Sequence, residues 1–318
     1  MAKGNSGVQY ADIGGERQGM VIRGENPDHP VLLFLHGGPG TPQYPVSRAT
    51  SAALEKLFTV CWWDQRGAGL SYAADIPPET MTLEQFVQDT AEVARLLMRR
   101  TNYRPLYLMG HSWGSLLGIH VASRYPELFA AYIGVSQVTN QVASERAAYS
   151  QMLARARKMR DDRTLRKLEQ FDLRDEQNID IQAYLPTRMR TMNRMGIGTK
   201  HVMRPAFLEY VWPVLTCRAY SLPRKLDYVR GIQFSMQHLM QVLLYTDVTK
   251  AVTRLELPTY IMHGAHDGVV SYAQSKAYYE TLDAPFKRFY TFDHSAHTPF
   301  DEEQERFIAI LRGDILLK

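Results

Sequence analysis

The chain has 318 residues, of which 45% are hydrophobic and 22% charged, a composition typical of a globular protein with a large core. Its formal net charge of +4 is too small to indicate nucleic-acid binding. No segment has the uninterrupted apolar length of a membrane span, and the N-terminal stretch lacks the apolar core of a secretion signal. We therefore expect a cytoplasmic protein, with neither nucleic acid nor a membrane span.

Strand-like and helical segments alternate over the first 135 residues. Buried-strand runs occupy residues 31–38, 58–64, 105–110 and 130–135. Residues 82–100 place their apolar side chains on one helical face, and Thr82 and Gln85 are spaced as a capping box. This alternation predicts the mostly parallel sheet of an α/β protein.

Residues 136–252 interrupt this pattern. They contain no clear strand run and are rich in Arg and Met, which favours helices. Alternation then resumes, with expected strands at 257–264 and 286–292 and expected helices at 272–282 and 300–313. We therefore expect an α/β core made of residues 1–135 and 253–318, with an inserted helical cap at 136–252.

The segment GHSWG, residues 110–114, sets a serine in the pattern Gly-x-Ser-x-Gly between an expected strand and an expected helix. In this pattern the serine occupies a sharp strand-to-helix turn. Gly110 and Gly114 lack a Cβ, which relieves crowding between that turn and the helix after it. We predict that Ser112 is a nucleophile rather than a structural turn residue.

A serine hydroxyl needs a base to take its proton and a carboxylate to orient that base. Both follow Ser112 in the order acid, then histidine: Asp267 comes just after an expected strand, and His297 follows the next strand. His294 is an alternative base. We prefer His297 because it lies deeper in its loop, beside Pro299 at the start of the last helix.

The glycine-rich segment HGGPG, residues 36–40, directly follows a buried strand. Its backbone can approach a substrate closely and present N–H groups to a developing negative charge. We expect the N–H groups of Gly38 and Trp113 to form this oxyanion hole, with Gly37 as a close alternative. His36 is expected to brace the loop by hydrogen bonds.

Five motifs together resemble the α/β-hydrolase fold, and in particular its proline iminopeptidase-like branch: HGGPG, WDQRGAGLS, GHSWGS, GAHDGVV and SAHTPFDEE. The resemblance covers about residues 8–135 and 255–312. It implies a mostly parallel sheet flanked by helices, and it maps Ser112, Asp267 and His297 onto the family's nucleophile, acid and base. It also implies that the DQRG stretch supports the oxyanion loop.

The cap lacks the arginine, tryptophan and glycine pattern that accompanies recognition of a free amino terminus in iminopeptidases. Glu145 and Glu209 are the cap carboxylates that we nominate for binding an amine, and Trp212 is an apolar candidate for contacting an acyl group. The missing pattern slightly favours neutral acyl groups over aminoacyl groups. Six methionines either line an adaptable pocket or fill the cap core: Met189, Met192, Met195, Met203, Met236 and Met240.

We expect a serine hydrolase that cleaves a small ester, amide or short peptide through an acyl-enzyme, without a metal or organic cofactor. The alternatives are an aminopeptidase of the proline iminopeptidase type, an acyltransferase and a ligand receptor on the same scaffold. A metal site would use His263, His266, Asp267, His294 and His297 as ligands. This alternative is less favoured, because a ligated His297 could not act as a base. The oligomeric state is left open.

Overall fold

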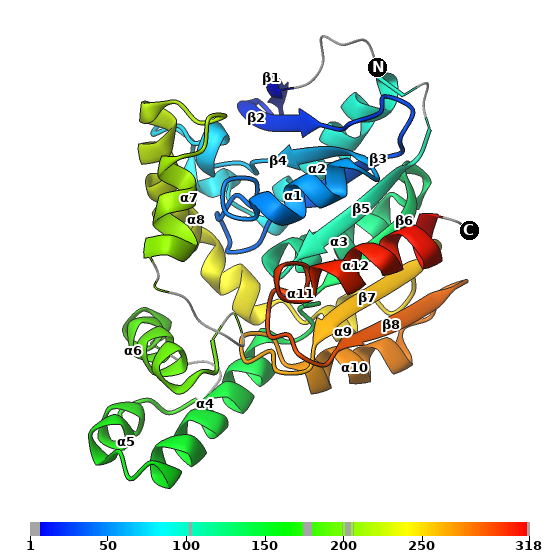
Figure 1. The fold of residues 1–318 in the computed structure, drawn as a ribbon. Helices are drawn as coiled ribbons and strands as arrows, with labels where there is room; N and C mark the ends of the chain where they lie inside the picture. The colour runs from blue at the N-terminus through cyan, green and yellow to red at the C-terminus, as the bar shows by residue number, and fades with distance from the viewer. Residues whose placement is uncertain are drawn as a thin grey trace.

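A computed structural model of the protein describes residues 7–101, 104–173, 180–198, 200, 205 and 207–316. An eight-stranded sheet runs through it in the order β1-β2-β4-β3-β5-β6-β7-β8 (Figure 1). β1 and β2 form an antiparallel hairpin and β2 pairs antiparallel with β4, whereas the other neighbours are parallel. The strands are β1 (Gly7–Ile13), β2 (Glu16–Arg23), β3 (Val31–Leu35), β4 (Thr59–Trp63), β5 (Leu106–His111), β6 (Phe129–Val135), β7 (Thr259–Gly264) and β8 (Lys287–Phe292).

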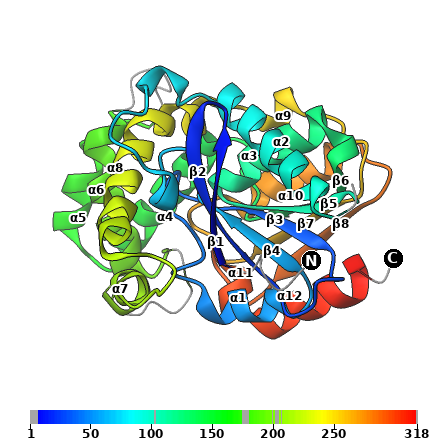
Figure 2. The same ribbon diagram turned by 90° about the horizontal axis from the view of Figure 1, so that it is seen from above.

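Helices cover both faces of the sheet (Figure 2). One face carries α1 (Arg48–Glu55), α11 (Pro299–Glu302) and α12 (Gln304–Ile310); the other carries α2 (Leu83–Arg99), α3 (Trp113–Arg124), α9 (Val248–Ala251) and α10 (Tyr272–Thr281). Short helical turns are also present: η1 (Gly69–Ser71), η2 (Pro78–Thr80), η3 (Pro126–Leu128), η4 (Phe207–Val211) and η5 (Leu311–Leu316).

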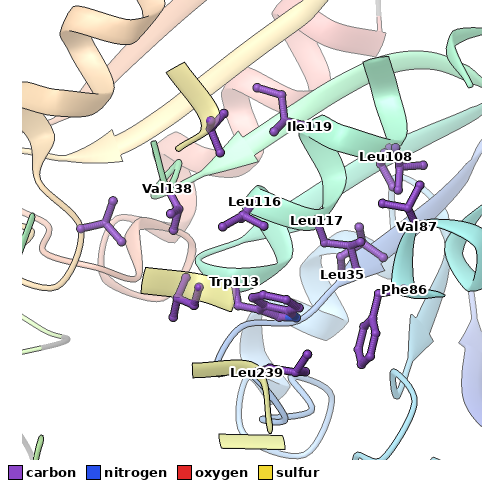
Figure 3. Packing of buried hydrophobic residues seen from close by; sticks show 14 of the residues in the cluster. Leu35, Phe86, Val87, Leu108, Trp113, Leu116, Leu117, Ile119, Val138 and Leu239 are labelled. Atoms are coloured by element: carbon purple, nitrogen blue, oxygen red, sulfur yellow. The ribbon is translucent and has the colours of Figure 1, made fainter. Parts of the chain in front are cut away.

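β3 shows why the expected buried strands read as continuous apolar runs. Because successive side chains alternate between faces, Leu33 and Leu35 join the hydrophobic cluster under α2 and α3, while Leu32 and Phe34 join the opposite cluster. Figure 3 shows Leu35 among residues of α2 and α3 in the first cluster. The predicted α/β fold with a mostly parallel sheet is confirmed.

The helix expected at 82–100 is present as α2. Thr82 caps it, accepting a hydrogen bond from the Gln85 backbone N–H at 3.2 Å. The other half of the capping box is absent, because the Gln85 side chain instead donates to Asp89 at 2.7 Å. The Asp89 carboxylate lies inside the core and needs that donor.

The segment between residues 136 and 252 forms helices and turns, with no strand among its described residues. Figure 1 shows its main helices gathered on one side of the sheet, at the left of the view: α4 (Gln141–Lys158), α5 (Asp162–Leu168), α6 (Ile181–Met195), α7 (Trp212–Leu215) and α8 (Leu222–Tyr245). The division into core and cap at residues 135 and 253 stays an interpretation. In the described part of the chain, no helix is long and apolar enough to cross a membrane.

Candidate active site

Ser112 occupies the turn between β5 and α3, with a φ of 54° and a ψ of −121°. A positive φ is costly for a residue with a Cβ, so surrounding packing must hold this conformation. The turn is tight: a Cβ added at Gly110 would stand 2.1 Å from the Gly114 carbonyl oxygen, and one at Gly114 would stand 2.1 Å from the Leu35 oxygen. Both glycines are therefore required by close backbone approach, as expected from the sequence.

Asp267 and His297 are in contact. His297 Nδ1 donates to Asp267 Oδ2 at 2.8 Å, and the other carboxylate oxygen accepts from the backbone N–H groups of Val269 and Val270, both at 2.9 Å. His263 Nε2 lies 3.2 Å from the same Oδ2. Burial alone would raise the pKa of Asp267, but the charge of His297 and the hydrogen bonds from His263 and His297 outweigh it and hold that pKa well below its usual range. The ionised carboxylate thus orients the imidazole of His297.

The loop that carries His297 is anchored through its backbone. The His297 carbonyl oxygen accepts hydrogen bonds from His111 Nε2 at 2.9 Å and from Ser136 Oγ at 3.0 Å. Burial, helped by the neighbouring His297, lowers the pKa of His111 to about 3, so His111 acts here as a neutral donor. His294 is exposed instead, and its backbone N–H donates to Glu303 at 2.9 Å.

The glycine loop after β3 lies against the serine. A Cβ at Gly37 would stand 3.1 Å from Ser112 Cβ, and Gly38, with a φ of +115°, lines the same cavity as Ser112. The backbone oxygen of Ser112 accepts from the N–H groups of Ser115 and Leu116, so Trp113 begins the first turn of α3, where N–H groups have no partner within a helix. Gly37, Gly38 and Trp113 thus remain candidates for the oxyanion hole.

Gln65, which the sequence analysis did not single out, joins this loop to the serine turn. Its backbone N–H donates to His36 Nε2 at 3.1 Å and its side-chain Nε2 donates to the His36 carbonyl at 3.0 Å. The indole N–H of Trp113 donates to Gln65 Oε1 at 2.9 Å. Burial lowers the pKa of His36 to about 4, so the neutral ring accepts through Nε2 and donates from Nδ1 to Gly37. His36 braces the loop, as predicted.

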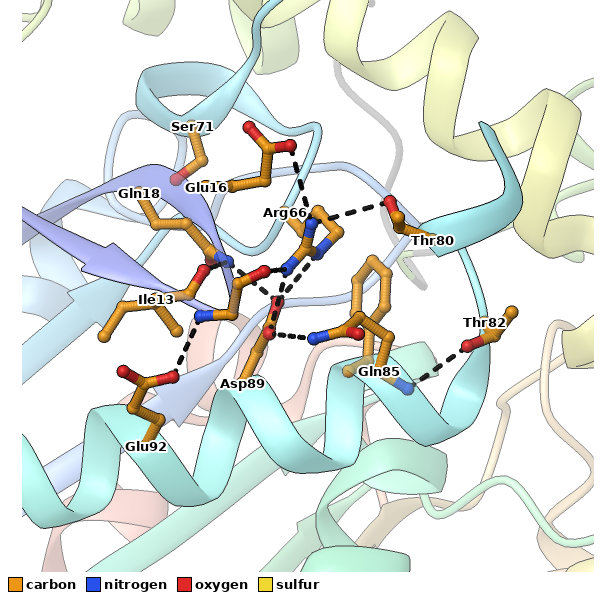
Figure 4. A network of polar contacts seen from close by, with 12 residues as sticks. Ile13, Glu16, Gln18, Arg66, Ser71, Thr80, Thr82, Gln85, Asp89 and Glu92 are labelled. Carbon is orange, nitrogen blue, oxygen red and sulfur yellow. Dashed lines mark hydrogen bonds and ion pairs between the residues drawn. The ribbon is translucent and has the colours of Figure 1, made fainter. Parts of the chain in front are cut away.

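Arg66, the next residue of the DQRG stretch, anchors the segment that carries Gln65 through buried polar contacts. Its guanidinium binds both oxygens of Asp89, at 2.8 and 3.0 Å, and also the Gly14 carbonyl at 2.8 Å (Figure 4). Gln18 and Gln85 donate to the same carboxylate. Arg66 and Asp89 are both fully buried, and a buried pair of this kind is maintained only with its remaining hydrogen bonds satisfied. The network fixes the segment that carries Gln65.

A cavity of about 150 Å³ lies between Ser112 and the cap helices. Its polar lining comes from Gln141 and Glu145 of α4 and from Arg188 and Asn193 of α6. The rest of the wall is largely apolar: Leu185, Met189, Met192, Met236, Met240, Leu243, Leu244, Val269 and Val270. A larger hollow of about 710 Å³, beside Tyr44 and Arg48, does not include Ser112 in its lining.

The methionines fall into three groups. Met189, Met192, Met236 and Met240 line the cavity, and Met192 and Met240 also belong to the buried hydrophobic cluster, so both sequence interpretations apply to these two. Met195 is buried in the hydrophobic core, while Met203 lies outside the described residues.

Of the three cap residues nominated for substrate binding, only Glu145 lines the cavity. Lys200 pairs with Glu209 and also lies 3.4 Å from Asp301, so the Glu209 carboxylate is held in a separate ion-pair cluster. The Trp212 side chain is 53% exposed and packs against Phe207. Neither Glu209 nor Trp212 lines this cavity, and their nomination for substrate binding stays a prediction.

Glu145 is held by two neighbours within the cavity wall. Arg188 Nε donates to its Oε2 in an ion pair, and Gln141 Nε2 donates to its Oε1 at 2.9 Å. Gln141 Nε2 also donates to the Val269 carbonyl at 3.0 Å. The pair links α4 to α6 and sets two opposite charges in a largely apolar cavity.

Comparison with known proteins agrees with this architecture. Residues 30–304 match the model of the alpha/beta hydrolase fold family. The chain belongs to the α/β-hydrolase family. It is 37% identical over 300 residues to the probable aminopeptidase YbaC of Bacillus subtilis strain 168, covering 94% of this chain and 93% of the relative.

More distant relatives span the same length. A proline iminopeptidase of Heyndrickxia coagulans is 25% identical over 311 residues, covering 96% of this chain and 97% of that protein. The crystal structure of a proline iminopeptidase from Mycobacterium smegmatis superposes with a TM-score of 0.68 at 19% identity, covering 96% of both chains, which shows a shared fold. This α/β-hydrolase is therefore a hydrolytic enzyme.

Proposed function

We propose that this α/β-hydrolase is a serine aminopeptidase of the proline iminopeptidase-like branch, acting on small aminoacyl amides and short peptides. His297 takes the proton of Ser112 as Ser112 Oγ attacks the carbonyl carbon, and Asp267 stabilises the resulting imidazolium. The C–N bond then breaks, and His297 gives its proton to the leaving amine. Water hydrolyses the acyl-enzyme by the same route in reverse.

The oxyanion of each tetrahedral intermediate is held by backbone N–H groups. We assign this role to Gly38 and Trp113, with Gly37 as the alternative, since the glycine loop lies against Ser112 and Trp113 starts α3. Gln65 keeps the loop and the helix start in register by binding both. The cytoplasmic location expected from the sequence stays a prediction.

The observation that carries the aminopeptidase proposal is the position of Glu145. Its carboxylate is buried and lines the same cavity as Ser112, so it can attract the ammonium group of an N-terminal residue whose carbonyl is at Ser112. Each carboxylate oxygen can accept more than one hydrogen bond, so the bonds from Arg188 and Gln141 leave acceptor capacity. The name of the relative from Bacillus subtilis agrees with this activity.

An esterase of small neutral acyl groups is the second candidate. It is favoured by the methionine, leucine and valine side chains that make up most of the cavity wall, which suit an uncharged acyl chain. The two candidates differ in their need for Glu145.

Glu145→Gln separates them, with Glu209→Gln as the matched control outside the cavity. For an aminopeptidase, losing the carboxylate lowers kcat/KM on an aminoacyl arylamide by the equivalent of about 2–5 kcal/mol, because a buried charge pair is broken. Hydrolysis of a simple acyl ester should change much less, and Glu209→Gln should leave both substrates nearly unaffected. Equal, mild losses on both substrates in Glu145→Gln would instead favour the esterase.

A further inference from the structure

Arg188 is a buried cation with unused donors. It is 7% exposed, lies on α6 and lines the cavity that contains Ser112. Its Nε donates to Glu145, but its two Nη nitrogens donate to no residue that the structure describes. These nitrogens are therefore free to donate to a group that is bound in the cavity.

Gln141 presents the complementary group. Its Nε2 is fully used, donating to Glu145 and to the Val269 carbonyl. These two bonds fix the orientation of the amide and leave Oε1 buried, with no partner in the described structure. The polar part of the cavity wall therefore offers an unused acceptor on Gln141 and unused cationic donors on Arg188, on either side of Glu145.

We propose that this cavity selects an acidic N-terminal residue, an inference that rests on the aminopeptidase function proposed above. The side-chain carboxylate of the substrate binds the Nη nitrogens of Arg188. The ammonium group of the substrate binds Glu145 and Gln141 Oε1. The methylene groups between them pack on the apolar wall formed by residues such as Met192 and Leu244.

The contact between Glu145 and Arg188 supports this arrangement. Because the two side chains touch, the substrate groups that bind them must be near neighbours on one side of the reacting carbonyl. In a free dipeptide that carbonyl lies between the ammonium and the terminal carboxylate, so Ser112 would have to reach between two side chains already in contact. An N-terminal glutamyl or aspartyl group carries both charges on the acyl side and meets the requirement.

The charge balance of the cavity points the same way. Glu145 and Arg188 are the charged residues of its described lining, and their charges cancel. An acyl group with one ammonium and one carboxylate keeps the sum at zero, with each charge beside an opposite one. An aminoacyl group with an uncharged side chain would bring an uncompensated positive charge into a cavity whose own two charges already cancel.

The test compares glutamyl, glutaminyl and leucyl arylamides, since glutamine is the uncharged isostere of glutamate. Wild-type enzyme should show a kcat/KM for the glutamyl substrate at least tenfold above that for the glutaminyl one. Arg188→Gln should bring this ratio to about one, and Arg188→Lys should lower it several-fold because lysine loses the forked geometry. Arg190→Gln, an exposed arginine on the same helix, should keep the wild-type ratio.

Two results would overturn the proposal, and they are distinguishable. If the wild type cleaves aminoacyl arylamides but handles the glutaminyl or leucyl substrate as well as the glutamyl one, the acidic selectivity is wrong and the aminopeptidase function survives. If no aminoacyl arylamide is cleaved while simple acyl esters are, both proposals fail. The wild-type ratio decides the first case even if Arg188→Gln does not fold.

Discussion

The indole nitrogen of Trp113 donates a hydrogen bond to Gln65 Oε1 at 2.9 Å. This bond links the first residue of α3 to Gln65, which also binds the glycine loop. Trp113 and the glycine loop supply the proposed oxyanion donors, so their relative position should depend on Gln65. We expect Gln65→Leu to lower kcat by about tenfold to a hundredfold, because small displacements of catalytic groups are costly.

The matched control for this prediction is Gln88→Leu, which makes the same chemical change at an exposed position of α2. Both variants should be assayed for kcat and for thermal unfolding. A folded Gln65→Leu enzyme with wild-type kcat would show that this hydrogen bond has no part in positioning the oxyanion donors.

The two histidines near the start of α11 should differ sharply. His297 is buried and bonded to Asp267, whereas His294 is exposed. We expect His297→Ala to lose activity by about a thousandfold or more and His294→Ala to lose much less. Steady-state kinetics on one chromogenic substrate measures both, and the reverse ranking would assign the base to His294.

Asp64 should make stability depend on pH. Burial raises the pKa of this carboxyl to about 7, although hydrogen bonds from Leu70 N–H and Tyr220 OH oppose the shift. In the unfolded chain an aspartate has a pKa of about 4. Between these values the folded protein retains a proton that the unfolded chain has released, so the contribution of Asp64 to stability is lost as pH rises through that window.

The Asp64→Asn variant should lack this contribution. Urea unfolding of both proteins from pH 4 to pH 8 provides the comparison, and the free energy of unfolding of the wild type should fall with rising pH relative to that of the variant. Parallel curves would mean that Asp64 keeps an ordinary pKa in the folded protein.

Local sequence signals predicted much of this architecture. Parallel strands such as β3 and β4 are buried on both faces and read as apolar runs, and the turn at Ser112 needs two glycines that a short motif reveals. The hairpin of β1 and β2 was not predicted as strands. β1 is only partly buried, so its sequence lacks a continuous apolar run.

Side-chain partners across long separations were not predictable in this way. The sequence does not distinguish Glu209 from Glu145, because it does not show that Lys200 pairs with Glu209. It also does not show that Trp212 is exposed and packs against Phe207. Gln65 lies within a recognised motif, yet its role depends on His36 and Trp113, which are distant in sequence. These relationships depend on how the cap helices and loops pack.

The most direct test of the account is the site of covalent labelling by a fluorophosphonate. Mass spectrometry of the wild-type enzyme should find one rapidly formed adduct, located on Ser112, with loss of hydrolytic activity in proportion to labelling. Ser112→Ala should be neither labelled nor active, and His297→Ala should label far more slowly because its serine lacks a base. Rapid labelling of Ser112→Ala, or retained hydrolysis by that variant, would contradict the assignment of Ser112 as the nucleophile.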